Sequence, residues 1–398
     1  MGRWLISALA LVIGFCFGQF AGAPASVSRT AEIEAILRGV RLPEGFSISL
    51  YALAPGARTI AVGPRGDAIF IGTGAENKIY ALTPGQVRAA SVAAMPIPTR
   101  LDLPHGLCFS PDGALYVAER NRIVAIPRAE TQWRRPKVVT VVKQGDLIPS
   151  SEEGGGHTMR VCRIGWDEKL YVSLGQPYDV TPRGKLALYD RIGIGGVLRM
   201  NLDGSGREVF ARGVRNSVGM DFNPADGSLW FTDNQSNEMG EDTPPGEMNR
   251  ADRAGLHFGF PWFGGGHART PDYAGETPPA EVVFPEIEET PHAADLGMAF
   301  YTGTAFPKKY RGGVFSAQHG SVARKEPVGA RIMFTRPGPG GRGGASEVFA
   351  EGWNRGAMPY LGRPVDVAQA PDGALLVTDD QNGAVYRIAY GRTMVARR

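Results

Sequence analysis

The amino-acid sequence predicts an all-β fold, a six-bladed β-propeller with a short N-terminal helix and loop insertions on one face. Three observations support this prediction. The 54 glycines and 30 prolines among 398 residues exceed the usual frequencies of about 7% and 5%, so tight turns are frequent. Short segments alternate between apolar and polar residues with a period of two, as half-buried strands do. One unit of strand, Pro-Asp-Gly-like turn and strand recurs along the chain.

The recurring unit is clearest at three places. It reads HGLCFSPDGALYVAERNRIVAI from His105, VGMDFNPADGSLWFTDN from Val218 and VDVAQAPDGALLVTDDQNGAVYRI from Val365. Weaker copies begin at Thr59, Val161 and Gly312. About six radially repeated hairpins predict six blades, because this arrangement leaves only short, protected sheet edges. A β-sandwich is the alternative, but that fold does not require the repeat.

The first element is a secretory signal peptide, expected over residues 1–25. Arg3 supplies a positive charge, residues 4–20 are almost continuously apolar, and small residues follow at 21–26. This order is typical of a cleaved export signal. We therefore expect a periplasmic or secreted protein with no stable membrane span after cleavage. A retained membrane anchor is the alternative, because the apolar run approaches the length that spans a bilayer.

The next elements are an N-terminal segment over residues 26–44 and the propeller itself over residues 45–390. Apolar residues recur at helical spacing within 30–40, which predicts one short amphipathic helix there. Residues 391–398 are expected to form a C-terminal tail.

Ring closure and loop insertions complete the predicted fold. Residues 46–53 read FSISLYAL and alternate strictly enough to form a strand that pairs with 385–389 and so closes the last blade. The uneven spacing of the repeats places loop insertions at 131–156 and 244–307.

Charge and cysteine content exclude several classes of function. Lys and Arg number 43 against 40 Asp and Glu, and no basic run is concentrated enough to indicate a nucleic-acid partner. Beyond the predicted signal peptide only Cys108 and Cys162 remain. They form either a disulfide, as an exported chain can, or two buried free thiols. Because CxxC and CxxCH motifs are missing, a zinc ribbon, a thioredoxin-type site and covalent haem are excluded.

Residues that precede the innermost strands of a propeller meet at the mouth of its central channel. In this chain these positions hold His105, the segment 154–160 with His157 and Arg160, the pair Arg215 and Asn216, the segment 318–320 and Arg363. Imidazoles, guanidiniums and amides in a ring suit a planar, polyanionic ligand, because the guanidinium fork matches a carboxylate. The alternative is that each Arg pairs with an acidic neighbour and each His has a structural partner.

His157 is the sharpest single candidate for catalysis. Three glycines precede it and allow the backbone to approach a ligand closely. A neutral imidazole is a suitable general base near neutral pH. One histidine after three glycines is a weak motif by itself.

A second group of candidate residues lies in the acidic segment 233–249. Its carboxylates and amides offer hard oxygen ligands of the kind that Ca²⁺ takes. The segment contains neither His nor Cys, which disfavours zinc and copper. A solvated acidic loop is the alternative.

The segment that carries a family resemblance spans residues 213–261 and reads GVRNSVGMDFNPADGSLWFTDNQSNEMGEDTPPGEMNRADRAGLHFGFP. It resembles the soluble PQQ-dependent sugar dehydrogenases of the glucose/sorbosone dehydrogenase family, and most of all their sorbosone dehydrogenase-like branch. Segments 154–177, 317–332 and 362–383 resemble the same family in the same order. The resemblance covers nearly the whole chain after about residue 40.

The resemblance implies a six-bladed propeller that holds PQQ and Ca²⁺ over its channel. His157 matches the family's general base, and Arg215 and Asn216 match its cofactor-binding pair. Arg363 matches one arginine that grips the PQQ carboxylates. Arg324 is a substitute for a PQQ-contacting lysine that has no clear match in this sequence.

The resemblance also implies a metal site and a substrate site. Asn234, Asp242 and Glu247 fall in the family's metal-binding loop. Gln176 stands where an Asp is expected near the substrate, with Asp179 three residues on. In glucose-oxidising relatives a second arginine of the late motif stands where this chain has Val365.

The predicted function is that of an exported PQQ- and Ca²⁺-dependent dehydrogenase. It would oxidise a sugar, or a sugar-like aldehyde or alcohol, by hydride transfer to PQQ. Electrons would pass to a separate acceptor, a quinone or a cytochrome, since the chain has no haem attachment motif. The alternatives are a calcium-dependent lactonase-type propeller and a non-catalytic periplasmic binding propeller.

Overall fold

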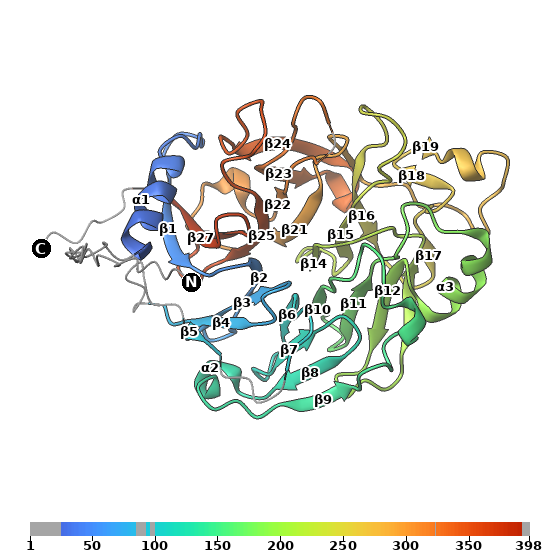
Figure 1. The fold of residues 1–398 in the computed structure, drawn as a ribbon, viewed down its shortest axis with the longest axis horizontal. Helices are drawn as coiled ribbons and strands as arrows, with labels where there is room; N and C mark the ends of the chain where they lie inside the picture. The colour runs from blue at the N-terminus through green and yellow to red at the C-terminus, as the bar shows by residue number, and fades with distance from the viewer. Residues whose placement is uncertain (1–24, 85–92, 96–99, 323, 392–398) are drawn as a thin grey trace, which may run out of the picture.

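The computed structural model describes residues 25–84, 93–95, 100–322 and 324–391. The predicted signal peptide, apart from Ala25, and the tail beyond residue 391 lie outside this part of the chain. Six sheets, each built around four antiparallel strands, surround a central axis (Figure 1). The predicted six-bladed β-propeller is confirmed.

The blades follow one another along the chain, and the first strand of each lies nearest the channel. The first blade consists of β2 (Ala57–Val62), β3 (Ile69–Thr73), β4 (Ile79–Leu82) and β5 (Ala93–Ala94). The second consists of β6 (Gly106–Phe109), β7 (Leu115–Ala118), β8 (Ile123–Ile126) and β9 (Val139–Val142). The third consists of β10 (Cys162–Ile164), β11 (Leu170–Leu174), β12 (Gly196–Met200) and β13 (Glu208–Arg212), with β17 (Leu256–His257) beside β13.

The second half of the ring repeats this pattern. The fourth blade consists of β14 (Met220–Phe222), β15 (Leu229–Asp233), β16 (Gly246–Ala251) and β20 (Ile287–Glu289). The fifth consists of β21 (Asp295–Phe300), β22 (Val314–Gln318), β23 (Arg331–Pro337) and β24 (Gly344–Ala350). The sixth consists of β25 (Pro364–Gln369), β26 (Leu375–Asp379), β27 (Ala384–Tyr390) and β1 (Phe46–Leu53).

The sixth blade joins the two ends of the propeller. Strand β1 pairs antiparallel with β27, with Phe46 opposite Tyr390 and Leu50 opposite Tyr386. The predicted closing strand is thus confirmed. The ring of Phe46 packs edge-on against Phe306, with 4.8 Å between ring centroids, which anchors the seam in an aromatic cluster.

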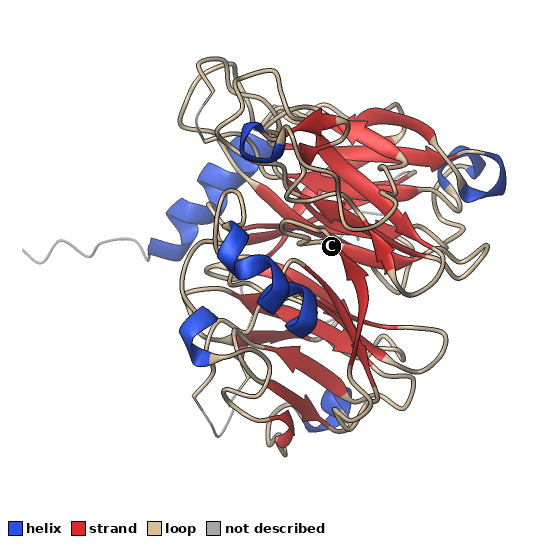
Figure 2. Ribbon diagram, turned by 90° about the vertical axis from the view of Figure 1, so that its right-hand side faces the viewer, coloured by secondary structure: helices blue, strands red, loops and turns tan. Residues whose placement is uncertain are grey.

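Helices lie at the periphery of the strands (Figure 2). The expected N-terminal helix is α1 (Ala25–Leu37), which starts earlier and ends earlier than residues 30–40. It docks through Ile33 and Leu37, which are buried against the fifth and sixth blades. The other α-helices are α2 (Ala129–Gln132) and α3 (Leu186–Ile192). Short 3₁₀ turns are η1 (Ser150–Glu152), η2 (Arg183–Lys185), η3 (Pro271–Tyr273), η4 (Lys308–Tyr310) and η5 (Pro339–Gly341).

The two segments expected as loop insertions contain strands of the blades themselves. Residues 131–156 include β9, and residues 244–307 include β16, β20 and β21, with the small hairpin β18 (Phe263–Gly265) and β19 (Ala268–Arg269). Turn-rich sequence concealed these strands, because most of them are short and lie between segments rich in glycine and proline.

Of the two alternatives for the cysteines, a disulfide or two free thiols, the structure shows the disulfide. Cys108 on β6 and Cys162 on β10 form a disulfide, with their Cα atoms 5.7 Å apart. The bond ties the inner strands of the second and third blades together. In the described part of the chain no helix is long and apolar enough to cross a bilayer.

Candidate functional site

A cavity of about 170 Å³ lies at the mouth of the channel, where segments from several blades meet. Five of the predicted residues line it: His157, Arg215, Asn216, Asn234 and Arg363. Each except Asn234 stands shortly before an innermost strand, and Asn234 follows β15 directly. Of the residues expected at the channel mouth, His157, Arg215, Asn216 and Arg363 thus line one cavity.

His157 is held with one ring nitrogen free. Its Nδ1 lies 2.6 Å from the backbone carbonyl oxygen of Gln176, which can only accept, so Nδ1 carries the proton. Burial, assisted by the positive charge of Arg215, lowers the pKa of His157 to about 4. The imidazole is consequently neutral above that pH, and its Nε2 lone pair is available to accept a proton.

The Arg215–Asn216 turn is positioned by a carboxylate that sequence reasoning did not assign to it. Asp233, at the end of β15, accepts hydrogen bonds from the backbone N–H groups of Arg215 at 2.7 Å and Asn216 at 2.6 Å. The Arg215 guanidinium is buried and pairs with Asp179 at 2.7 Å. It also donates to the Asn234 carbonyl oxygen at 3.1 Å. At this wall of the cavity the Arg215 guanidinium therefore lies near two carboxylates, those of Asp179 and Asp233.

A second wall of the cavity lies around Arg363, whose guanidinium forms no ion pair within the described residues. Arg363 donates to the backbone carbonyl oxygens of His319 at 3.1 Å and Gly320 at 2.7 Å. The His319 ring also lines the cavity, and its Nε2 lies 2.9 Å from a carboxylate oxygen of Asp380, which pairs in addition with Arg58. Burial alone would raise the pKa of Asp380, but His319 and the two guanidiniums lower it to about 2.

The two predicted substrate residues do not line the cavity. The amide of Gln176 is fully buried, where its Oε1 accepts from the Tyr178 N–H at 3.0 Å and the Thr181 hydroxyl at 3.2 Å. Asp179 is committed to Arg215 and to the Asn237 N–H at 2.9 Å. Both side chains make contacts that support the cavity wall around Arg215. Gln176 bonds the His157 ring only through its backbone carbonyl oxygen.

Three other positions also lie away from the cavity. Arg324 forms an ion pair at 2.9 Å with Asp242, whose side chain is 92% exposed. His105 and Arg160 are both buried inside the protein, and the His105 Nδ1 lies 2.9 Å from the Arg160 carbonyl oxygen. Arg160 in turn donates to the His157 carbonyl oxygen at 3.1 Å, so it supports the loop of the candidate base.

Val365 points into the protein. Its side chain is 1% exposed and packs in a hydrophobic cluster between blades with Tyr171, Phe231 and Leu296. The valine therefore does not stand in the cavity as a shortened substitute for an arginine.

Oxygen atoms without partners gather around β15, β16 and β21. Gln235 Oε1, Asn249 Oδ1 and Asp295 Oδ2 are buried without a hydrogen-bond donor. Glu247 is buried nearby and accepts from the Gly266 N–H at 2.6 Å. Such a donor set suits a hard cation. Within the described residues, no three or more His, Cys, Asp or Glu side chains are arranged to hold a metal ion.

Known proteins share sequence and fold with this chain. The sequence model of the glucose/sorbosone dehydrogenase family matches residues 130–387, well over half of the chain. The chain belongs to this family. Membership indicates an oxidoreductase of the sugar dehydrogenase type. A relative from Borreliella burgdorferi, itself uncharacterized, is 29% identical over 373 residues, which are 91% of this chain and 94% of that protein.

Solved structures confirm the propeller fold of this family member. The iodide structure of Trichoderma reesei Carbohydrate-Active Enzymes Family AA12 has a TM-score of 0.71 and 19% identity, covering 89% of this chain and 98% of that chain. The holo form of the pyranose dehydrogenase PQQ domain from Coprinopsis cinerea has a TM-score of 0.68 and 16% identity, covering 88% and 97%. The PQQ-bound aldose sugar dehydrogenase from Streptomyces coelicolor has a TM-score of 0.61 and 17% identity, covering 88% and 99%.

Proposed function

We propose that this protein is an exported PQQ- and Ca²⁺-dependent dehydrogenase that oxidises a sugar, or a sugar-like aldehyde or alcohol, and passes the electrons to a separate acceptor. One observation carries the proposal: a neutral histidine with a free Nε2, His157, shares a cavity with two guanidiniums, those of Arg215 and Arg363. A base beside anion-binding groups is what oxidation of an alcohol on a polyanionic cofactor requires.

The cavity residues fit PQQ, which is planar and carries three carboxylates. Arg363 and the His319 ring would bind carboxylates at one wall, since a guanidinium makes charge-assisted hydrogen bonds to them. Arg215 and Asn216 would contact the cofactor at the other. When bound, PQQ supplies an ortho-quinone that accepts the hydride of the sugar carbon.

His157 removes the hydroxyl proton of the substrate at its Nε2 while the carbon is oxidised. The Gln176 carbonyl fixes the ring in the required tautomer through the 2.6 Å hydrogen bond to Nδ1. The nearby guanidiniums of Arg215 and Arg363 stabilise negative charge that develops in the cavity.

Calcium would be held by the oxygen-rich segment that follows β15. The Asn234 carbonyl oxygen and the carboxylate of Glu247 are the ligands we propose, with the unpaired Gln235 Oε1 beside them. Asp242 is not included, because its exposed carboxylate is turned to Arg324. Export is supported by the disulfide, which persists in oxidising compartments.

Reconstitution tests the proposal. Metal-free protein is incubated with PQQ and Ca²⁺, and dye reduction is followed with a panel of aldoses. We expect sugar-dependent reduction that needs both additions and that EDTA abolishes. Lactone hydrolysis without PQQ, or no activity in any combination, would contradict the proposal. The His157→Ala variant serves as the matched control, because it lacks the base and keeps both guanidinium walls.

A further inference from the structure

His319 stands on the Arg363 side of the channel-mouth cavity, and a carboxylate holds its ring. The residue follows β22 directly and lines the cavity, with 15% of its side chain exposed. Its Nε2 lies 2.9 Å from a carboxylate oxygen of Asp380, which follows β26. Because the pKa of Asp380 is about 2, this oxygen is ionised and can only accept, so the ring proton is on Nε2. The other ring nitrogen, Nδ1, therefore carries a lone pair.

Two polar groups of this wall remain open to a ligand. Among the described residues none bonds the Nδ1 of His319, and this nitrogen is not enclosed by the protein. Arg363 lies next to it, because its Nε and Nη2 donate to the carbonyl oxygens of His319 and Gly320 at 3.1 and 2.7 Å. The third guanidinium nitrogen, Nη1, likewise bonds no described residue and is not enclosed. A carboxylate at this wall can therefore meet both side chains.

A carboxylate and a neutral His319 do not fit together. Both would present lone pairs, because Nδ1 has no hydrogen while Nε2 donates to Asp380. A proton on Nδ1 turns the contact into a charge-assisted hydrogen bond. The imidazolium would then be bonded at both nitrogens, to Asp380 on one side and to the ligand on the other.

Charged groups from three other elements face His319: Asp380 after β26, Arg58 on β2 and Arg363 before β25. Burial lowers the pKa of His319, the bond to Asp380 raises it, and the two guanidiniums lower it. The other histidines of the cavity, His157 and His292, each have a ring nitrogen bonded to a backbone carbonyl oxygen. The free His319 ring is thus neutral at neutral pH, and an arriving carboxylate would raise its pKa.

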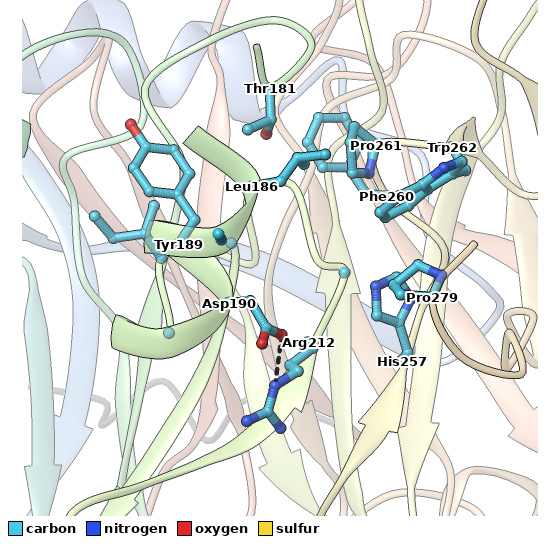
Figure 3. A pocket seen from close by; sticks show the side chains of 15 residues that line it. Thr181, Leu186, Tyr189, Asp190, Arg212, His257, Phe260, Pro261, Trp262 and Pro279 are labelled. Carbon is cyan, nitrogen blue, oxygen red and sulfur yellow. Dashed lines mark ion pairs between the residues drawn. The ribbon is translucent and has the colours of Figure 1, made fainter. Parts of the chain in front are cut away.

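A larger cavity, of about 350 Å³ beside α3, uses its carboxylate differently (Figure 3). There Asp190 forms an ion pair with Arg212 at 2.8 Å, drawn as a dashed line, and its side chain is 65% exposed. The histidine of that cavity, His257, accepts the Gly259 N–H at 3.1 Å and forms no ion pair with Asp190. Asp380 instead links an arginine to an imidazole that a ligand can reach.

We propose that Asp380 is a positioning residue that holds His319 ready to take up a proton and to bind, together with Arg363, a carboxylate of the ligand in the channel-mouth cavity. Binding of a polycarboxylate is then coupled to the uptake of one proton from solvent, which comes to lie on Nδ1 of His319. No other bond is made or broken. The proposal rests on the proposed function only in naming PQQ as the natural ligand.

Proton uptake is measured by calorimetry at about pH 7.5 in two buffers that differ in ionisation enthalpy. The probe is benzene-1,3,5-tricarboxylate, which is planar, fully ionised at this pH and not a quinone. We expect uptake of about one proton for each molecule bound. Because protons are taken up on binding, the Kd should increase by up to about tenfold for each unit by which the pH is raised.

Four variants assign the proton. Asp380→Asn keeps an acceptor for Nε2 but removes the negative charge, so uptake should fall to nearly zero and binding should weaken about tenfold. His319→Asn places an amide near the position of Nδ1, and binding should become independent of pH. Asp190→Asn is the matched control, because it removes a carboxylate that pairs with an arginine in the other cavity. That variant and His157→Ala should take up as many protons as wild type.

Three results would overturn the proposal. The first is equal proton uptake by wild type and Asp380→Asn, and the second is loss of uptake in His157→Ala, which would assign the proton to the candidate base. The third is no binding of the tricarboxylate by folded wild type. If Asp380→Asn does not fold, as judged by circular dichroism, unchanged uptake in His319→Asn contradicts the proposal instead. No sugar is oxidised in these titrations, so failure of the sugar reaction leaves the binding result standing.

Discussion

The two walls of the channel-mouth cavity use arginine in opposite ways. Arg215 forms an ion pair with Asp179 and lies within the influence of the Asp233 carboxylate, so its charge is matched by carboxylates of the protein itself. Arg363 binds only backbone carbonyl oxygens, and one carboxylate, Asp380, serves both Arg58 and His319 beside it. The first arginine is thus part of the framework, and the second retains attraction for a ligand.

This difference predicts how an anion with carboxylates at one end would be oriented in the channel-mouth cavity. Carboxylates gain most at the Arg363 wall, where a partly buried guanidinium bonds only backbone carbonyl oxygens and can still form an ion pair. The part of the cavity around His157 and Arg215, where the charges are matched, would then receive the uncharged reacting group. The following predictions test whether the two arginines differ in this way.

The largest effect is expected on stability, from Arg215→Ala. The substitution leaves the partly buried Asp179 carboxylate without its guanidinium and removes a positive charge near buried Asp233, which should cost about 3 kcal/mol. Urea unfolding measures the loss. Arg41→Ala removes an exposed ion pair with Glu351 and should change the midpoint little. Equal midpoints for both variants would mean that Arg215 is not a framework residue.

Turnover should fall about 100-fold in His157→Ala, because the general base is lost. The control is His292→Asn, which alters another cavity histidine at a positive φ of 62° that asparagine tolerates. We expect less than a fivefold change there. PQQ affinity, measured by calorimetry, should stay the same in both variants, and an unchanged kcat in His157→Ala would remove this residue from the chemistry.

Cofactor affinity should decrease ten- to a hundredfold in Arg363→Ala, as expected for one lost charge-assisted hydrogen bond. Calorimetric titration with PQQ measures this. Arg324→Ala is the control, because its guanidinium is occupied by the exposed Asp242 and lies outside the cavity. If Arg324→Ala weakens binding as much, the wall that receives the carboxylates has been assigned wrongly.

The smallest effect is expected from pH. Since burial and Arg215 lower the pKa of His157 to about 4, the base stays unprotonated above that value. The kcat should therefore be nearly constant from pH 8 to about pH 5 and fall as the pH drops below about 4, where protonation blocks Nε2. A midpoint near the ordinary histidine value of about 6.5 would show that Arg215 and burial do not control this ring.

The sequence was sufficient for the architecture and for part of the cavity lining. Hairpin periodicity predicts blades, and the position before an innermost strand brings His157, Arg215 and Arg363 together without knowledge of their contacts. Asp380 and Arg58 were missed because their partners lie on other blades, far apart in sequence. Resemblance singled out Gln176 and Arg324 as site residues, but packing shows that their side chains do not line the cavity.

The seam between β1 and β27 has a consequence for how the molecule forms. Strand β1 is synthesised before all other strands, but it completes the last blade. It can pair only after β27, the last strand, has been synthesised. Until the two meet, β27 presents an open edge to which a strand of another chain can add. Contacts between segments so distant in sequence are slow to form. The ring is therefore complete only when the whole chain is present, and a chain shortened at either strand would be prone to join its neighbours edge to edge.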